Sequence, residues 1–261
     1  MSPSPDRPDP ALFGESPSRD ARFREVERWV DCVNLPEGTP EQRLEFFHRQ
    51  MNEELNVLEN AARDLAEFPE VDWSLRLWLA RQCSDEARHA LNYRRILERR
   101  GGRVGQYPIL NFQYRILGKI PTLIGRLAIQ NRTFEADGLD AVTFVAEVAR
   151  REGDTELAEM YEMQQCDEVV HVRFANEWIR QQVEADPRQF IRLAKALDQG
   201  RRAFEQVFAQ GGMGVSKYGV AETERLEAGF APEEVRTAVE LTEARREAVR
   251  ARAGSPAESG A

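Results

Sequence analysis

The sequence is poor in the residues that build thiolate sites. Its 261 residues include only three cysteines, Cys32, Cys83 and Cys166, and no two of them form a C-x-x-C pair. This spacing provides neither a disulfide framework nor a zinc or rubredoxin-like cysteine site. Few and widely spaced cysteines are typical of a reducing compartment, so we expect a cytoplasmic protein.

Long apolar runs and an excess of positive charge are also missing. No window approaches 18 uninterrupted apolar residues, and the N-terminus lacks a basic stretch followed by an apolar one, so we expect neither a membrane span nor a signal peptide. A formal net charge of -9 argues against a general polyanion-binding surface, which disfavours nucleic acid as a partner. The size of the chain requires no oligomer, and a homodimer stays open.

Alternating runs of β-branched residues are absent, so the sequence predicts no strand with confidence. Leu, Ala, Glu, Arg and Gln dominate instead, with apolar residues three and four apart, and this pattern predicts an all-α fold. Four long helices are expected at about 40–68, 72–100, 121–152 and 154–185. Shorter helices are expected at about 19–33, 186–210 and 232–251.

The order of these segments predicts two helical hairpins joined by a crossover of about 20 residues, which is the connectivity of a four-helix bundle with one long connection. Thr39 with Pro40 is expected to start the first helix, and Asp72 the second. Four prolines among the first ten residues predict a disordered lead. The expected organisation is a lead at 1–18, a bundle at 19–185, a helical extension packed on it at 186–254, and a disordered tail at 255–261.

Two of the three histidines stand in the same five-residue frame, D-E-x-x-H. The sequence reads DEARH from Asp85 and DEVVH from Asp167. In each frame Glu and His are three residues apart, so both side chains leave the same face of a helix and can ligate one metal ion or two adjacent ions. The two pairs are Glu86 with His89, and Glu168 with His171.

A di-metal carboxylate site in a bundle needs one further Glu from each of the other two helices. On the first helix Glu54 is level with Glu86 across the hairpin turn and belongs to the apolar stripe, whereas Glu59 is turned off that stripe and could only support a ligand. On the third helix Glu135 precedes Glu168 by 33 residues, close to the 32 between Glu54 and Glu86. We therefore predict Glu54 and Glu135 as the remaining ligands.

The expected turn near residue 153 favours a ligand slightly later than Glu135 on the third helix. Two alternatives account for this mismatch. Either Gly138 marks a bulge in the helix, or Asp140 shares the ligand role.

Asp85 and Asp167 each precede a predicted ligand Glu. A metal-bound histidine usually donates its other ring N–H to a carboxylate, which fixes the tautomer. We expect Asp85 to serve His171 and Asp167 to serve His89, although the reverse pairing and a solvent-exposed Asp stay open.

Residues one or two helical turns from the ligands would line a substrate pocket. Tyr93 follows His89 by four residues and Tyr161 precedes Glu168 by seven, so both are candidates for a substrate or redox role. A plain core position is the alternative for both tyrosines. Three amide side chains stand four residues before a ligand Glu: Gln82, Asn131 and Gln164.

The set Glu54, Glu86-x-x-His89, Glu135 and Glu168-x-x-His171 resembles the ligand set of the ferritin-like di-iron carboxylate superfamily. More narrowly, NEELNVLENAARDLAEFP, DEARHA, FEADGLDA and DEVVHV resemble a bacterial ferritin-like family classed as a domain of unknown function and related to tRNA-modifying non-haem di-iron hydroxylases. The similarity covers about residues 40–182. Asn52 stands where this family would have a histidine, which puts a supporting or substrate contact in doubt.

This resemblance implies an oxidoreductase that activates O2 with two Fe ions, or one Fe and one Mn, using electrons from a reductase or ferredoxin. The expected reaction is hydroxylation, N-oxygenation or desaturation of a small organic molecule. Four carboxylates and two imidazoles form a hard, anionic donor set that suits these metals. The alternatives are a tRNA-modifying hydroxylase and a metal-binding helical protein without catalytic activity.

Overall fold

Helices make up most of the protein, which confirms the all-α prediction. The computed structural model describes residues 8–209 and 218–254. These residues form two compact units, one of residues 8–134 and 177–209 and the other of residues 135–176 and 218–254. No helix within the described ranges is both long and apolar enough to cross a membrane.

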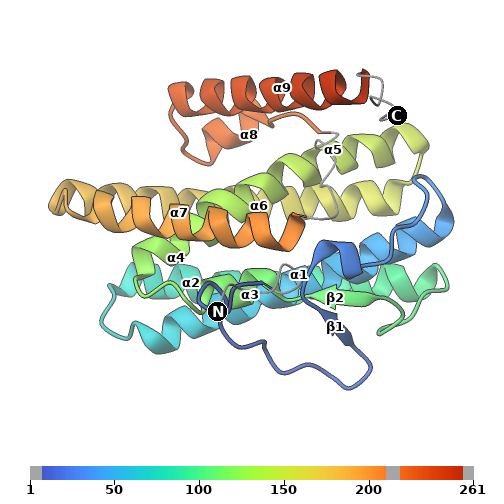
Figure 1. Ribbon diagram of the computed structural model, residues 1–261, viewed down its shortest axis with the longest axis horizontal. Helices are drawn as coiled ribbons and strands as arrows, with labels where there is room; N and C mark the ends of the chain where they lie inside the picture. Colours follow the sequence, from blue (N-terminus) through green and yellow to red (C-terminus); the bar gives the residue numbers. More distant parts are fainter. Residues whose placement is uncertain (1–7, 210–217, 255–261) are drawn as a thin grey trace, which may run out of the picture. The chain divides into compact units, whose positions relative to one another are not determined.

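The first unit is built on a helical hairpin of α1 (Pro40–Glu67) and α2 (Trp73–Arg99) (Figure 1). Thr39 Oγ1 accepts a backbone N–H of the first turn of α1 at 3.2 Å, and Asp72 Oδ1 does the same for α2 at 2.9 Å. After α2 the chain turns at Gly101, whose φ of 88° lies in the left-handed region that favours glycine. The sequence signals therefore predicted both helices correctly.

The predicted helix at 19–33 is wrong, because this stretch pairs with a distant segment. β1 (Arg24–Val26) runs parallel to β2 (Pro108–Leu110), with Val26 opposite Leu110, and η1 (Trp29–Asp31) is a single 3-10 turn. All of β2 is buried, so its backbone polar groups need partners within the protein. Pairing with β1 supplies them and overrides the local helical preference.

The N-terminal segment also departs from the prediction of a disordered lead at 1–18. Residues 1–7 of that lead lie outside the described ranges. Leu12 and Phe13 are buried in one apolar cluster with residues of α3 (Phe112–Leu117). The Gly14 N–H donates to the carbonyl of Arg115 at 2.7 Å. Two apolar side chains hold this segment on α3. Two adjacent apolar residues show no helical or strand periodicity, so the sequence pattern could not predict this contact.

The third predicted helix is interrupted earlier than Gly138. The chain forms α4 (Leu123–Ile129), then the π-helical turn η2 (Gln130–Glu135), then α5 (Ala136–Glu152). Gly138 lies within regular α5, so the distortion ends at Glu135 instead of following it. The fourth helix, α6 (Thr155–Ala185), has the predicted bounds.

Within residues 186–209 and 218–254, three helices follow α6. α7 (Gln189–Phe208) belongs to the first unit and packs against α4, whereas α8 (Glu222–Glu227) and α9 (Pro232–Gly254) belong to the second. The helices predicted at 186–210 and 232–251 correspond to α7 and α9. The predicted tail at 255–261 lies outside the described residues.

His48 joins α1 to the segment that leads into β2. Its ring is fully buried, lies 5.6 Å from the ring of Phe23 and 5.8 Å from that of Tyr107, and its Nε2 accepts the N–H of Gly105 at 2.8 Å. Burial lowers the pKa of His48 from 6.5 to about 4. Between these pH values the folded protein therefore binds fewer protons than the unfolded chain, so the free energy of unfolding rises with pH. The contribution of the neutral His48 ring is complete above pH 6.5 and is lost as the pH falls towards 4.

Replacing His48 with glutamine, which keeps an acceptor but does not titrate, is expected to remove this pH dependence. The difference in free energy of unfolding between wild type and His48→Gln should be constant above pH 6.5 and fall by about 3 kcal/mol on acidification to pH 4. Urea unfolding at a series of pH values measures it. Parallel pH profiles for the two proteins would contradict the assignment.

Candidate metal centre

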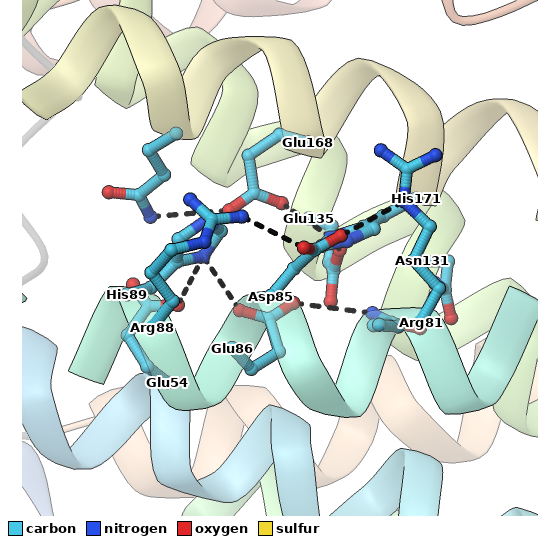
Figure 2. Close-up of polar contacts among 12 residues, drawn as sticks. Glu54, Arg81, Asp85, Glu86, Arg88, His89, Asn131, Glu135, Glu168 and His171 are labelled. Carbon is cyan, nitrogen blue, oxygen red and sulfur yellow. Dashed lines mark hydrogen bonds and ion pairs between the residues drawn. The ribbon is translucent and has the colours of Figure 1, made fainter. Parts of the chain in front are cut away.

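The first unit brings three of the predicted ligands together (Figure 2). Glu54 projects from α1, and Glu86 and His89 project from α2. Their exposed fractions are 6%, 1% and 2%. His89 Nδ1 lies 2.9 Å from Glu86 Oε2 and 3.5 Å from Glu54 Oε2. These three side chains, named the first cluster, present two carboxylates and one imidazole in a buried position.

A second cluster of the same composition lies in the second unit. Glu135 ends the π-helical turn η2, and Glu168 and His171 project from α6. All three are at most 5% exposed. His171 Nδ1 lies 3.2 Å from Glu135 Oε2 and 3.5 Å from Glu168 Oε2 (Figure 2). Each of the two clusters thus contains a Glu-x-x-His pair and one further glutamate.

The donor chemistry of the clusters fits a metal cation. Within each cluster the potential ligand atoms lie within 4.8 Å of one another. Burying carboxylates costs free energy unless their charge is compensated, and a divalent cation compensates it. Carboxylate oxygens with imidazole nitrogens suit Fe, Mn or Zn better than the soft ions that thiolates select. These buried acidic and histidine groups could therefore hold metal ions.

Amide side chains orient a glutamate in each cluster from one helical turn away. Gln82 Nε2 lies 3.5 Å from Glu86 Oε1, and Asn131 Nδ2 of η2 donates to Gln82 Oε1 at 3.1 Å. In the second cluster Gln164 Nε2 donates to Glu168 Oε1 at 3.2 Å. All three amides are buried, at positions that the spacing from the ligands had indicated. They restrict the rotamers of the two glutamates before any metal binds.

Asp85 interacts with arginines of its own helix. Its carboxylate accepts from Arg81 at 3.2 Å and from Arg88 at 2.8 Å (Figure 2). Asp167, on α6, is half-buried. The predicted pairing of each Asp with the histidine of the other frame joins residues of different units and stays a prediction.

Glu59 and Asp140 do not lie in either cluster. Glu59 Oε1 accepts from Arg19 Nη1 at 2.6 Å, so its carboxylate serves the N-terminal segment. Both Asp140 oxygens accept from Arg225, at 2.8 and 2.6 Å. Asp140 therefore does not share the ligand role. No local pattern indicated either arginine, because each partner is far away in the sequence.

The two candidate tyrosines occupy core positions. Tyr93 is 3% and Tyr161 2% exposed, and they lie on α2 and α6, the helices that carry the Glu-x-x-His pairs. A substrate or redox role for them stays a prediction. Asn52, the departure from the family pattern, donates to the carbonyl of Leu110 at 3.0 Å and accepts from Arg19 at 3.0 Å. This residue thus fixes the end of β2 and the N-terminal segment on α1.

The fold and site define a predominantly helical protein with buried Glu and His clusters that could hold metal. Over residues 4–236 the sequence matches the family described as "Protein of unknown function (DUF455)". The chain belongs to this family, which agrees with the resemblance to a domain of unknown function. No curated protein and no solved structure matches the chain.

Proposed function

We propose that the protein is a ferritin-like non-haem di-iron oxidoreductase that uses O2 and external electrons to oxidise a small organic molecule. The observation that carries the proposal is the duplicated cluster, in which two glutamates and one histidine are buried twice in the same arrangement. A single Glu-x-x-His pair on a helix would be unremarkable. Two buried Glu-x-x-His pairs, each completed by a glutamate from another helical element, support a pair of metal ions.

Each cluster would hold one ion through its histidine and its two glutamates. Two hairpins with one long crossover, inferred from the sequence, would provide the four helix lines that such a site needs. When bound, a pair of redox-active ions supplies two electrons to O2 in one event.

The chain's own residues would prepare this chemistry. Gln82 and Gln164 hold one oxygen of a glutamate in each cluster, which leaves the second oxygen for a metal. Tyr93 and Tyr161 are buried on the same helices as the ligands and would limit the access of water to the reacting centre. Specificity for the organic substrate would come from apolar and aromatic contacts around the metal ions.

A tRNA-modifying hydroxylase is the second candidate, and exposed arginines at the end of α2 favour it. Arg94, Arg95, Arg99, Arg100 and Arg103 lie within ten residues. Arg94 is already paired with Glu98 at 2.9 Å, and the chain carries a net charge of -9. A small substrate is therefore the first choice, and retained activity after ribonuclease treatment of a cell-extract substrate pool would separate the two candidates.

The first test is the metal content of protein produced in medium supplemented with iron and manganese. We expect about two metal ions per chain, magnetically coupled to each other, and O2 consumption when the reduced protein meets air. Elemental analysis and electron paramagnetic resonance measure the number and the coupling. Absence of bound metal after anaerobic reconstitution with Fe(II), or two ions without coupling, would overturn the proposal.

A further inference from the structure

The short helix α8 contacts both helices that carry the second cluster. On the α5 side, Arg225 binds Asp140, and the N–H of Ala221 donates to Asp140 Oδ1 at 2.9 Å. On the α6 side, three side chains reach α8 or the residue after it. They are Gln165 to Glu224 Oε1 at 3.2 Å, Arg173 to the carbonyl of Glu227 at 2.8 Å, and Asn176 to the carbonyl of Ala228 at 2.9 Å.

Arg225 is the centre of this arrangement. Its side chain is 10% exposed, and it binds Asp140 with two nitrogens, Nε at 2.8 Å and Nη2 at 2.6 Å. The same Nη2 donates to the carbonyl of Ala136 at 3.2 Å, and the guanidinium lies 5.4 Å from the ring centre of Phe230. A guanidinium fork can make these contacts simultaneously, whereas a lysine ammonium cannot reproduce their geometry.

The contact with Ala136 reaches the backbone directly beside a ligand. Glu135 is the last residue of the π-helical turn η2, and Ala136 begins α5. Asp140 follows Glu135 by five residues, so at about 100° per residue the two side chains point in directions about 140° apart. Arg225 therefore holds this helix start through a face that differs from the one presenting Glu135 to His171.

The α6 contacts lie on both sides of the Glu-x-x-His pair, whereas the α5 contacts all follow Glu135. Gln165 lies three residues before Glu168, and Arg173 lies two residues after His171. Gln165 Nε2 also donates to Thr143 Oγ1 of α5 at 2.8 Å. Because α8 bonds to α5 just after Glu135 and to α6 on both sides of the Glu-x-x-His pair, it restrains the separation of these helices near the ligands, where His171 Nδ1 lies 3.2 Å from Glu135 Oε2.

We infer that α8 with Ala228, named the α8 clip, sets the geometry of the second cluster, and that Arg225 and Asp140 are positioning residues for Glu135. The inference rests on the proposed function, since it concerns metal binding by that cluster. It assigns the C-terminal part of the chain a role in the metal centre without adding a ligand.

A purely structural role makes a different prediction. Replacing both members of a buried ion pair with apolar residues of similar size is often neutral for stability, because the desolvation of two charges disappears with their attraction. The double variant Arg225→Met/Asp140→Leu should therefore keep the fold. The double variant loses the hydrogen bond to the carbonyl of Ala136 and the two hydrogen bonds between Arg225 and Asp140. A purely structural role predicts an unchanged metal site in this variant, whereas a positioning role predicts a changed one.

The test is a titration of metal-free protein with Co(II), whose visible absorption depends on its coordination geometry. Wild type is expected to bind about two equivalents. In the double variant, one of the two sites should bind about 10 to 100 times more weakly with an altered absorption spectrum, and the other site should be unchanged. Arg225→Lys, which keeps the charge, should weaken the same site. Amide hydrogen exchange of residues 131–140 in the metal-free double variant should be faster than in wild type.

An ion pair between α5 and α6 that lies away from the ligands provides a matched control. Arg150 of α5 and Glu162 of α6 form an ion pair at 2.6 Å, with side chains 53% and 41% exposed. Arg150→Gln/Glu162→Gln should bind Co(II) like wild type. Two wild-type sites with unchanged affinity and spectrum in the double variant, or in Arg225→Lys if the double variant does not fold, would overturn the clip alone. A wild type that binds no Co(II) would overturn the proposed function and the clip with it.

Discussion

Replacing Glu86 with alanine is expected to abolish metal binding at the first cluster while the helical content stays close to that of wild type. Glu86 is 1% exposed and lies 2.9 Å from His89, so its removal leaves one carboxylate and one imidazole to hold an ion. We expect at least a hundredfold loss of affinity, about 3 kcal/mol of binding free energy. Glu168→Ala should have the same effect at the second cluster.

The fold of these variants should tolerate the change, because alanine is the best helix former and the substitution removes a buried carboxylate. The metal-free variants are therefore expected to be at least as stable as metal-free wild type. Metal analysis, circular dichroism and O2 consumption measure the three quantities. Glu59→Ala is the control, because the Glu59 carboxylate pairs with Arg19 outside either cluster. Retained metal and O2 consumption in both ligand variants would contradict the site.

Valine at position 125 is expected to destabilise the first unit strongly. Gly125 lies in α4 where it crosses α7, and a Cβ there would be 2.6 Å from Ala196 Cβ and 2.8 Å from Ile120 Cγ2. These distances are shorter than van der Waals contact, and neither neighbour is the end of a flexible side chain. Overpacking of this kind should lower the free energy of unfolding by about 3 kcal/mol. Urea unfolding monitored by circular dichroism measures the loss.

Gly138 provides the matched comparison, because it is also a helical glycine but has open space around it. Apart from its chain neighbours and the backbone of its own helix, no atom of the described residues would lie within 4 Å of a Cβ at this position in α5. Gly138→Ala should therefore stabilise the protein by about 0.5 to 1 kcal/mol through helix propensity alone. If Gly125→Ala were equally stabilising, the close packing of α4 on α7 would be contradicted.

The long helices and the members of the two clusters could be predicted because their signals are local. Thr39 and Asp72 mark the starts of α1 and α2, and each caps a backbone N–H only three residues further along the chain. Each Glu-x-x-His pair needs only the 3.6-residue helical period to bring its side chains together. Glu54 could be placed beside its pair because a tight hairpin aligns residues at equal distances from the turn.

The features that the sequence did not reveal depend on partners far along the chain. β1 is a strand because buried β2 needs hydrogen-bond partners, and Asp140 is held by Arg225 across 85 residues. η2 contains no glycine or proline that would mark its extra-wide turn. Charged residues such as Arg19 and Arg225 read as solvated surface until the tertiary structure buries them.

The distance between Asp140 and Arg225 also sets an order of events during protein synthesis. The segment from η2 to α6 leaves the ribosome with every ligand of the second cluster well before α8 does. Until then Asp140 lacks the guanidinium that compensates its charge, so water competes for the space that the α8 clip will occupy. Metal loading of the second cluster should therefore follow the emergence of α8. A nascent chain arrested before residue 221 should accept an ion, if at all, only at the first cluster.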